Sequence, residues 1–340
     1  MQSGSRVPIT VGEGHMNAVR KVITAVVLLL PLCAAAQSGI ENYPSKAIRL
    51  ICPFPAGGAV DFMSRFFAQR MTPALGQQVF VDNRGGAAGI IGMEAGARAP
   101  ADGYTLTMAN LSVTSINPFL YSKLPYDVLR DFAPVIELAQ SVNLLVVHPS
   151  LPVKSLKELI ALAKAKPGAL NYASPGSGGP AHLATELLKS MTGVKMVHVP
   201  YKGAGAAIPA VLAGESQVLI EPVATAMPHV RSGRMRALAV TSATRTPILP
   251  ELPTVTEAGV PGFEFTSWYG VIVPAATPVA VVTRLNSTLN RVLEQPDVKE
   301  QLTAQAMLIV GGTPAAFGTR IKAEMARWGK VVKDTGAKVD

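Results

Sequence analysis

Two glycine-rich loops are the segments of this chain whose residue types best suit ligand binding. The first contains Pro55-Ala56-Gly57-Gly58, and the second runs Ser174-Pro175-Gly176-Ser177-Gly178-Gly179. Each loop follows an apolar run predicted as a strand and precedes a predicted helix. A helix N-terminus carries unpaired N–H groups and the positive end of the helix dipole, and glycine lets a ligand approach the backbone. The pair therefore predicts a cleft that grips an anion from both sides. The alternative is two ordinary turns.

Side chains beside the loops add candidate contacts. Asp61 would begin the first helix, where we interpret it as a helix-stabilising or water-holding group. His182 would lie one turn into the second helix, either as a ligand contact or as a packed or capping residue. Ser112 and Thr114 follow a predicted strand and offer hydroxyl groups to the cleft or to a turn.

Two positions later in the chain carry further hypotheses. Glu221 ends a predicted strand, where it can accept from a ligand ammonium or hydroxyl, or serve as a salt-bridge or hinge element. Trp268 and Tyr269 either wall the cleft or belong to the core. The predicted ligand-binding set is Pro55, Ala56, Gly57, Gly58, Asp61, Ser112, Thr114, Ser174, Ser177, Gly178, Gly179, His182, Glu221 and Trp268.

Catalytic motifs do not account for these residues. Gly176-Ser177-Gly178 resembles a nucleophile elbow, but Pro175 stands where G-x-S-x-G needs its first glycine. The sequence contains no H-E-x-x-H, C-x-x-C or G-x-x-x-x-G-K-[ST] pattern. We therefore predict no catalytic residue, no metal and no cofactor, with a cryptic hydrolase as the alternative.

The N-terminal segment is typical of a secretory signal. Arg20 and Lys21 precede the apolar run 22–32, and Ala34-Ala35-Ala36 supplies a cleavage site. The apolar run, of about 11 residues, is too short to span a bilayer. We predict a signal peptide over 1–36, with Met16 as an alternative start, and export to the periplasm. Of the two cysteines, cleavage would leave only Cys52 and hence no intrachain disulfide.

Composition favours a large globular protein. Apolar residues make up 49% of the chain, and the formal net charge is +9. The basic residues are spread along the chain without an arginine-rich run, which argues against nucleic acid as a partner. The excess positive charge either helps to attract organic anions or is simply solvated.

Predicted strands and helices alternate along the chain. This order is typical of an α/β fold with parallel sheets, whose ligands bind at the carboxyl ends of the strands. The predicted strands are 48–53, 79–81, 104–109, 196–199, 216–220, 235–241 and 267–273, with extended chain over 132–147. The predicted helices are 61–75, 155–164 (with a capping box from Ser155 to Glu158), 181–191, 206–212, 278–293 and 313–332.

Several motifs in order resemble one receptor family. They include Asn83-Arg84-Gly85-Gly86-Ala87-Ala88-Gly89, Ala101-Asp102-Gly103-Tyr104, Val199-Pro200-Tyr201-Lys202-Gly203 and Ser267-Trp268-Tyr269-Gly270, together with both glycine loops. Over nearly all of the mature length, the chain is similar to the Bug family, the TctC-like receptors of tripartite tricarboxylate transporters.

The resemblance implies a fold. It is a two-domain periplasmic binding protein of type II-like topology, in which each domain is a mostly parallel sheet flanked by helices. Crossover strands near 140–146 and 236–244 would form the hinge. The expected domains are 42–142 together with 241–340, and 143–240.

The resemblance also implies a function. The first loop would hold a carboxylate of a small solute through backbone N–H groups and ordered water, and the second loop would close over it from the other domain. The receptor, expected to be a monomer, would deliver the solute to a membrane permease of TctA/TctB type. A sensor that docks on a signalling protein is the alternative. Many family members have aspartate followed by a small polar residue where this chain has Glu221-Pro222. Because an acidic group at the cleft would repel a second carboxylate, the sequence does not clearly favour a tricarboxylate.

Overall fold

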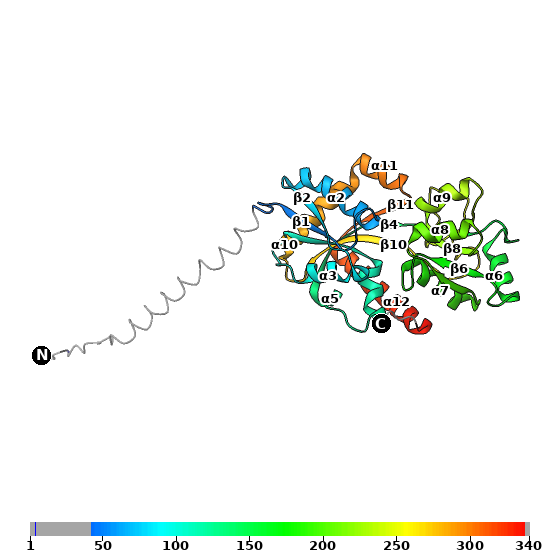
Figure 1. Cartoon of the computed structure of the whole chain (residues 1–340). Helices are drawn as coiled ribbons and strands as arrows, with labels where there is room; N and C mark the ends of the chain where they lie inside the picture. The colour runs from blue at the N-terminus through cyan, green and yellow to red at the C-terminus, as the bar shows by residue number, and fades with distance from the viewer. Residues whose placement is uncertain (1–3, 5–41, 337–340) are drawn as a thin grey trace. The chain divides into compact units, whose positions relative to one another are not determined.

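The computed structural model describes Gly4 and residues 42–336, and it divides the chain into one unit over 1–45 and another over 46–340. Apart from Gly4, the predicted signal peptide at 1–36 lies outside the described residues. Residues 46–340 contain the two sheets and the helices that surround them (Figure 1).

The first sheet has six strands in the order β11-β4-β10-β3-β1-β2. Its strands are β1 (Ile48–Cys52), β2 (Val79–Asn83), β3 (Thr105–Asn110), β4 (Phe132–Ser141), β10 (Ser267–Pro274) and β11 (Met307–Gly311). Strands β1, β2 and β3 pair in parallel, whereas β10 pairs antiparallel with both β3 and β4, and β11 pairs antiparallel with β4.

The second sheet has five strands in the order β7-β6-β8-β5-β9. They are β5 (Asn143–Val147), β6 (Asn171–Ser174), β7 (Val197–Pro200), β8 (Val218–Pro222) and β9 (Arg236–Val240). Strand β5 is antiparallel to both of its neighbours. The predicted α/β fold with sheets flanked by helices is confirmed, but both sheets are mixed rather than mostly parallel. Parallel pairing needs a crossover between successive strands, and β5, β10 and β11 enter their sheets in the opposite direction.

Helices surround both sheets (Figure 1). Around the first sheet are α2 (Ala59–Leu75), α3 (Ile90–Ala97), α4 (Asn117–Leu120), α5 (Val128–Asp131), α10 (Val279–Glu294), α11 (Pro296–Ala304) and α12 (Pro314–Thr335), with a 3-10 turn at Ala87–Gly89 and a π-helical turn at Ser112–Ile116. Around the second are α6 (Leu156–Ala165), α7 (Pro180–Thr192), α8 (Ala204–Leu212) and α9 (Val223–Arg231). Sequence reasoning missed α4, α5, α9, α11 and β11.

The chain passes between the sheets at two places. Strand β4 ends at Ser141 and β5 begins at Asn143, while the return path runs through residues 241–266. Thr241 joins the two passages, because its backbone N–H donates to Asn143 O over 3.0 Å and its hydroxyl donates to Phe265 O over 2.7 Å. The two sheets thus divide the strands near the expected boundaries, and the exact domain limits stay a prediction.

Trp268 and Gly270, on the face of β10 towards α12, are closely packed against that helix. Trp268 and Phe317 are fully buried and meet edge to face, with ring centroids 5.3 Å apart. A Cβ on Gly270 would overlap the Phe317 ring and lie 2.7 Å from Ile136 O. Gly270 is therefore required by close approach rather than by backbone conformation.

We expect Gly270→Ala to lower the free energy of unfolding by about 1–3 kcal/mol, because the added methyl group overpacks this contact. The control is Gly205→Ala in α8, where no atom lies within 4 Å of the added Cβ and stability should rise by about 0.5–1 kcal/mol. Urea denaturation monitored by circular dichroism measures both. Equal effects of the two substitutions would contradict the packing argument.

Candidate ligand-binding site

The first glycine loop connects β1 to α2 and exposes the start of that helix. Gly58 is the N-cap residue and provides no side-chain cap. Gly57 has φ +91°, a conformation that L side chains rarely adopt. Its N–H donates to Asp61 Oδ2 over 2.9 Å, so the loop is fixed by the helix that follows it.

Asp61 is turned into this loop and is only 4% exposed. Its carboxylate accepts from Asn83 Nδ2 over 2.8 Å and lies 3.0 Å from Arg65 Nε. Burial raises the pKa of Asp61, but the hydrogen bonds from Arg65, Gly57 and Asn83 outweigh it and hold the pKa below its ordinary value. Asp61 is thus a paired anion within the loop, not a group directed at a second carboxylate.

A pocket of about 410 Å³ opens over the same helix terminus. Its lining comes from the first loop and α2, the end of β3, the π-helical turn, β10 and the first residue of α7. The residues are Phe54, Pro55, Ala56, Gly58, Ala59, Val60, Asn110, Leu111, Ser112, Pro180, Ser267 and Tyr269. None of these lining residues is charged, so the polar groups on offer are backbone N–H groups, hydroxyls and one amide.

The second glycine loop is also fixed by its own helix. Gly179 is an N-cap without a side-chain cap, and the N–H of Gly178 donates to His182 Nδ1 over 2.9 Å. His198 Nε2 lies 2.6 Å from Ser174 Oγ, which itself donates to Gly176 O over 3.0 Å.

Three aromatic rings stack beneath this loop. The His182 and His198 ring centroids are 4.0 Å apart, and the Tyr172 ring centroid lies 4.8 Å from that of His198 and 6.2 Å from that of His182. The Tyr172 hydroxyl donates a hydrogen bond to the Glu186 carboxylate, which also forms an ion pair with Lys189. Burial lowers the pKa of His182, and burial together with His182 lowers that of His198 to about 4. Both imidazoles are therefore neutral near pH 7.

The structure brings part of the predicted set to the pocket. Pro55, Ala56, Gly58 and Ser112 line it. From the second loop region, Pro180 reaches the lining. Gly57, Asp61, Ser174, Gly178 and His182 support the loops from within, while Gly179 caps α7 and Ser177 is exposed outside the lining.

Three predicted contacts lie away from the pocket. Thr114 is fully buried and donates to Asn110 O over 2.7 Å within the π-helical turn. Glu221 is buried and accepts from Thr225 Oγ1 over 2.7 Å, and burial raises its pKa. Trp268 is fully buried in the core, whereas Tyr269 lines the pocket.

Sequence reasoning left out Asn110, Ser267 and His198 as site residues, and it considered Tyr269 as a cleft wall without including it in the predicted set. The alternation of side chains along β10 was a usable signal, because Trp268 and Tyr269 must point to opposite faces. His198 gave no such signal, since its partners Ser174 and His182 come from another strand and a helix.

Neither a membrane-spanning helix nor a metal centre is found in the described part of the chain. None of its helices has both the length and the apolar character needed to cross a membrane. Residues 42–336 also hold no group of three or more His, Cys, Asp or Glu side chains arranged for a metal ion.

This two-sheet fold, with a pocket at two helix N-termini, is that of solute-binding receptors, and the comparisons with known proteins agree. Residues 63–337 match the family described as tripartite tricarboxylate transporter family receptor, TctC. The chain belongs to this family, as the motifs predict.

Relatives cover nearly its full length. Protein BugT of Bordetella pertussis is 38% identical over 95% of this chain and all of its own. An R. palustris protein solved with adipate is 39% identical, with a TM-score of 0.77 over 87% of this chain and 99% of its own. MatC from Rhodopseudomonas palustris, solved with bound malate, is 31% identical, with a TM-score of 0.73 over 85% of this chain and all of its own.

We expect Asp61→Asn to lower the free energy of unfolding at pH 7 by about 1–3 kcal/mol, because an amide cannot accept from every donor that the carboxylate serves. Since folding lowers the pKa of Asp61, its contribution is present above the ordinary value of 3.8 and is lost as the pH falls through the folded-state value. The free energy of unfolding is measured with denaturant for both proteins at pH 7 and at pH 3. The difference between the two proteins should be smaller at pH 3 than at pH 7.

Glu94→Gln is the matched control for this substitution. Glu94 and Arg98 have the same i,i+4 spacing as Asp61 and Arg65, but the Arg98 side chain is 73% exposed. Its loss should cost no more than about 0.5 kcal/mol. A cost for Asp61→Asn as small as this would remove Asp61 as the support of the first loop.

The histidine stack predicts a pH dependence of stability. As the pH falls below the ordinary value of 6.5, His198 gains a proton in the unfolded chain while staying neutral in the fold until about 4. Stability should therefore fall over this interval. His198→Gln keeps an N–H donor for Ser174 but removes the titration, so it should lose less stability than the unmodified protein between pH 7 and pH 5.

Thermal melts of both proteins at the two pH values measure this difference. The groups that act on His198 besides its own burial are His182, Glu186 and Lys189, and all three remain in the variant. If both proteins lose the same stability between pH 7 and pH 5, His198 is not held neutral in the folded protein.

Proposed function

We propose that this chain is an exported receptor that binds a small carboxylated solute in the pocket above α2 and passes it to a membrane permease. It acts as a binding protein without catalysis and without a cofactor. Export through the signal-like segment 1–36 would place it in the periplasm, and it would work as a monomer.

The observation that carries this proposal is the convergence of two uncapped helix N-termini on one uncharged pocket. Gly58 and Gly179 cap α2 and α7 without a side chain, and Gly58 and Pro180 both line the pocket. A carboxylate there would meet backbone N–H donors and the positive ends of two helix dipoles. An ammonium group would meet the wrong sign of charge.

The pocket chemistry favours carboxylates of modest size. Its volume of about 410 Å³ falls in the lower part of the range of small-molecule sites, about 300–1,000 Å³. Ser112, Asn110 and Tyr269 can hydrogen-bond a second polar group of the solute. Relatives solved with adipate and with malate support a solute of this class.

Closure would follow from the two passages between the sheets. The chain crosses at Val142 and again through 241–266, and bending there would bring α7 and the second glycine loop over a solute held by the first. A solute that contacts both sides stabilises the closed state, because only that state offers both sets of donors. The closed form would be the one that a permease recognises.

Gly58→Asp tests the site. Gly58 has an ordinary φ of −88° and open space around its Cβ position, so the variant should fold. Its carboxylate would stand in the pocket and repel an anionic solute. We expect the affinity for adipate or malate, measured by isothermal titration calorimetry, to fall at least 10-fold, or about 1.4 kcal/mol.

Gly58→Asn is the matched control, since it adds nearly the same volume without the charge. It should retain more affinity than Gly58→Asp. Binding that is equal in the aspartate variant and the unmodified protein would place the carboxylate elsewhere. If neither acid binds, a thermal-shift screen of other mono-, di- and tricarboxylates should find a stabilising ligand, and a flat screen of folded protein would count against the receptor function itself.

A further inference from the structure

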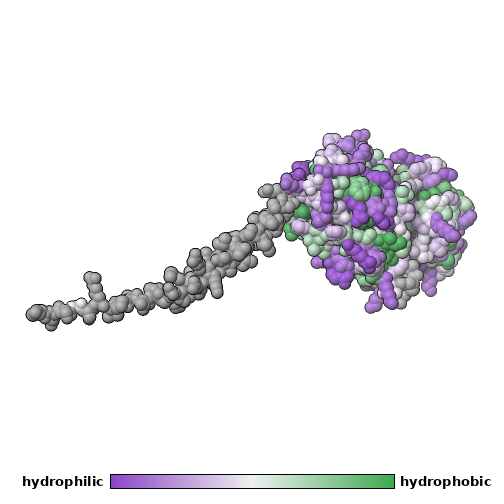
Figure 2. Space-filling model, turned by 60° about the vertical axis from the view of Figure 1, so that its left-hand side comes forward, coloured by the Kyte–Doolittle hydropathy of each residue, from purple (hydrophilic) through white to green (hydrophobic). Residues whose placement is uncertain are grey.

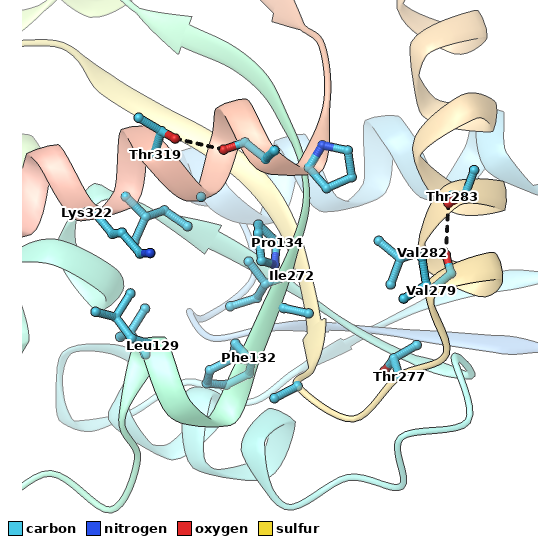
Figure 3. Close-up of a pocket in the computed structure, with 17 residues that line it drawn as sticks. Leu129, Phe132, Pro134, Ile272, Thr277, Val279, Val282, Thr283, Thr319 and Lys322 are labelled. Atoms are coloured by element: carbon cyan, nitrogen blue, oxygen red, sulfur yellow. Dashed lines mark hydrogen bonds between the residues drawn. The ribbon is translucent and has the colours of Figure 1, made fainter.

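A second cavity, of about 600 Å³, lies towards the other end of β10 from the candidate site. Ser267 and Tyr269, at the start of β10, belong to the first pocket, whereas Ile272, near its end, lines the second. In Figure 3, residues of α12 stand on one side of this cavity and Val279, Val282 and Thr283 of α10 on the other, with Pro134 and Ile272 between them.

The lining is apolar apart from three threonines and one cation. Side chains such as Leu129, Phe132 and Val282 form the walls, and Lys322 is the one charged residue among those that line the cavity. Lys322 is exposed, and within the described residues no carboxylate lies in ion-pair range of it. Figure 3 shows it on the α12 side, above Leu129.

The hydroxyl groups around the cavity are already committed as donors. Thr277 donates to Pro274 O over 2.7 Å, Thr283 to Val279 O over 2.9 Å, and Thr319 to Ala315 O over 3.0 Å. The last two bonds are drawn in Figure 3. A ligand therefore finds the Lys322 ammonium as its side-chain donor.

The surrounding backbone has the same sign of charge. Helix α10 begins at Val279 and α12 at Pro314, and both residues line the cavity. The positive ends of two helices, of 16 and 22 residues, thus border the cavity and have the same sign as the Lys322 ammonium.

We propose that this cavity binds an apolar monocarboxylate, with its hydrocarbon body between α10 and α12 and its carboxylate on Lys322. The volume is within the range of small-molecule sites. A second carboxylate would have to be buried against apolar walls without a partner, which is costly. This site goes beyond the proposed solute site, whose lining has no charged side chain and suits more polar acids.

Dodecanoate is the probe, titrated below its micelle-forming concentration into the folded protein and monitored by calorimetry. We expect saturable binding, with at least 10-fold weaker affinity in Lys322→Glu. The control Lys157→Glu makes the same charge change at an exposed position of α6 and should bind as the unmodified protein does. Dodecanol, which lacks the charge, should bind at least 10-fold more weakly than dodecanoate.

A second variant fills the cavity. A Cβ on Gly318, which lines it, would lie 3.3 Å from Pro134 Cγ, so Gly318→Leu should abolish dodecanoate binding if the variant folds. If it does not fold, Lys322→Glu alone decides.

The two sites are separated by cross-tests. Gly58→Asp should leave dodecanoate binding unchanged, and Lys322→Glu should leave adipate or malate binding unchanged. Loss of dodecanoate binding in Gly58→Asp would place the fatty acid in the first pocket, and equal affinity in Lys322→Glu would remove the site. The proposal would also be overturned if the protein associated with anionic phospholipid vesicles but did not bind free dodecanoate.

Discussion

The candidate site depends on one hydrogen-bonding device that the chain uses twice. In each glycine loop, the N–H of the residue before the N-cap donates to the side chain four positions later, from Gly57 to Asp61 and from Gly178 to His182. The acceptor is the third residue of the helix, so the arrangement resembles a capping box moved back by one residue. The loop is held from inside the helix, and its outer face and the N-cap glycine stay free of side chains. A pocket lined by backbone donors follows from this arrangement.

The two acceptors differ in charge, and each needs its own compensation. Asp61 is an anion close to a pocket that would hold another anion. Arg65 neutralises its charge through an ion pair, and Asn83 donates a hydrogen bond to its second oxygen. His182 is neutral near pH 7 because burial lowers its pKa. Neither loop therefore presents an uncompensated negative charge to the pocket, although both use side chains that titrate.

Figure 2 shows hydrophilic residues over most of one face of the described body, with smaller apolar patches between them.

Local patterns predicted the parts of the fold that depend on neighbouring residues. The glycine loops stand between β1 and α2 and between β6 and α7, and Ser155 accepts from the N–H of Glu158 at the start of α6, as the capping motif predicts. Contacts between distant segments were not predictable in this way. The antiparallel insertion of β10 and β11 and the neighbourhood of His198 depend on pairing across the fold. Helix α9 was missed, and it contains Pro228, a residue that usually interrupts a helix.

Strand β10 joins the two cavities in one element, and its pairing argues that they act independently. It is hydrogen-bonded to β3 on one side and to β4 on the other, so it has no second arrangement to adopt. Coupling between sites requires an element with two states whose balance both ligands shift. The passages that would bend on closure, at Val142 and 241–266, adjoin the β4 and β10 ends near the solute pocket. The second cavity is lined by β4, β10, the loop that follows β10, α5, α10 and α12, and of these elements α12 also contacts α7. Closure at those passages would leave the walls from β4, β10, α5 and α10 in place, and we expect occupancy of one cavity not to alter affinity at the other.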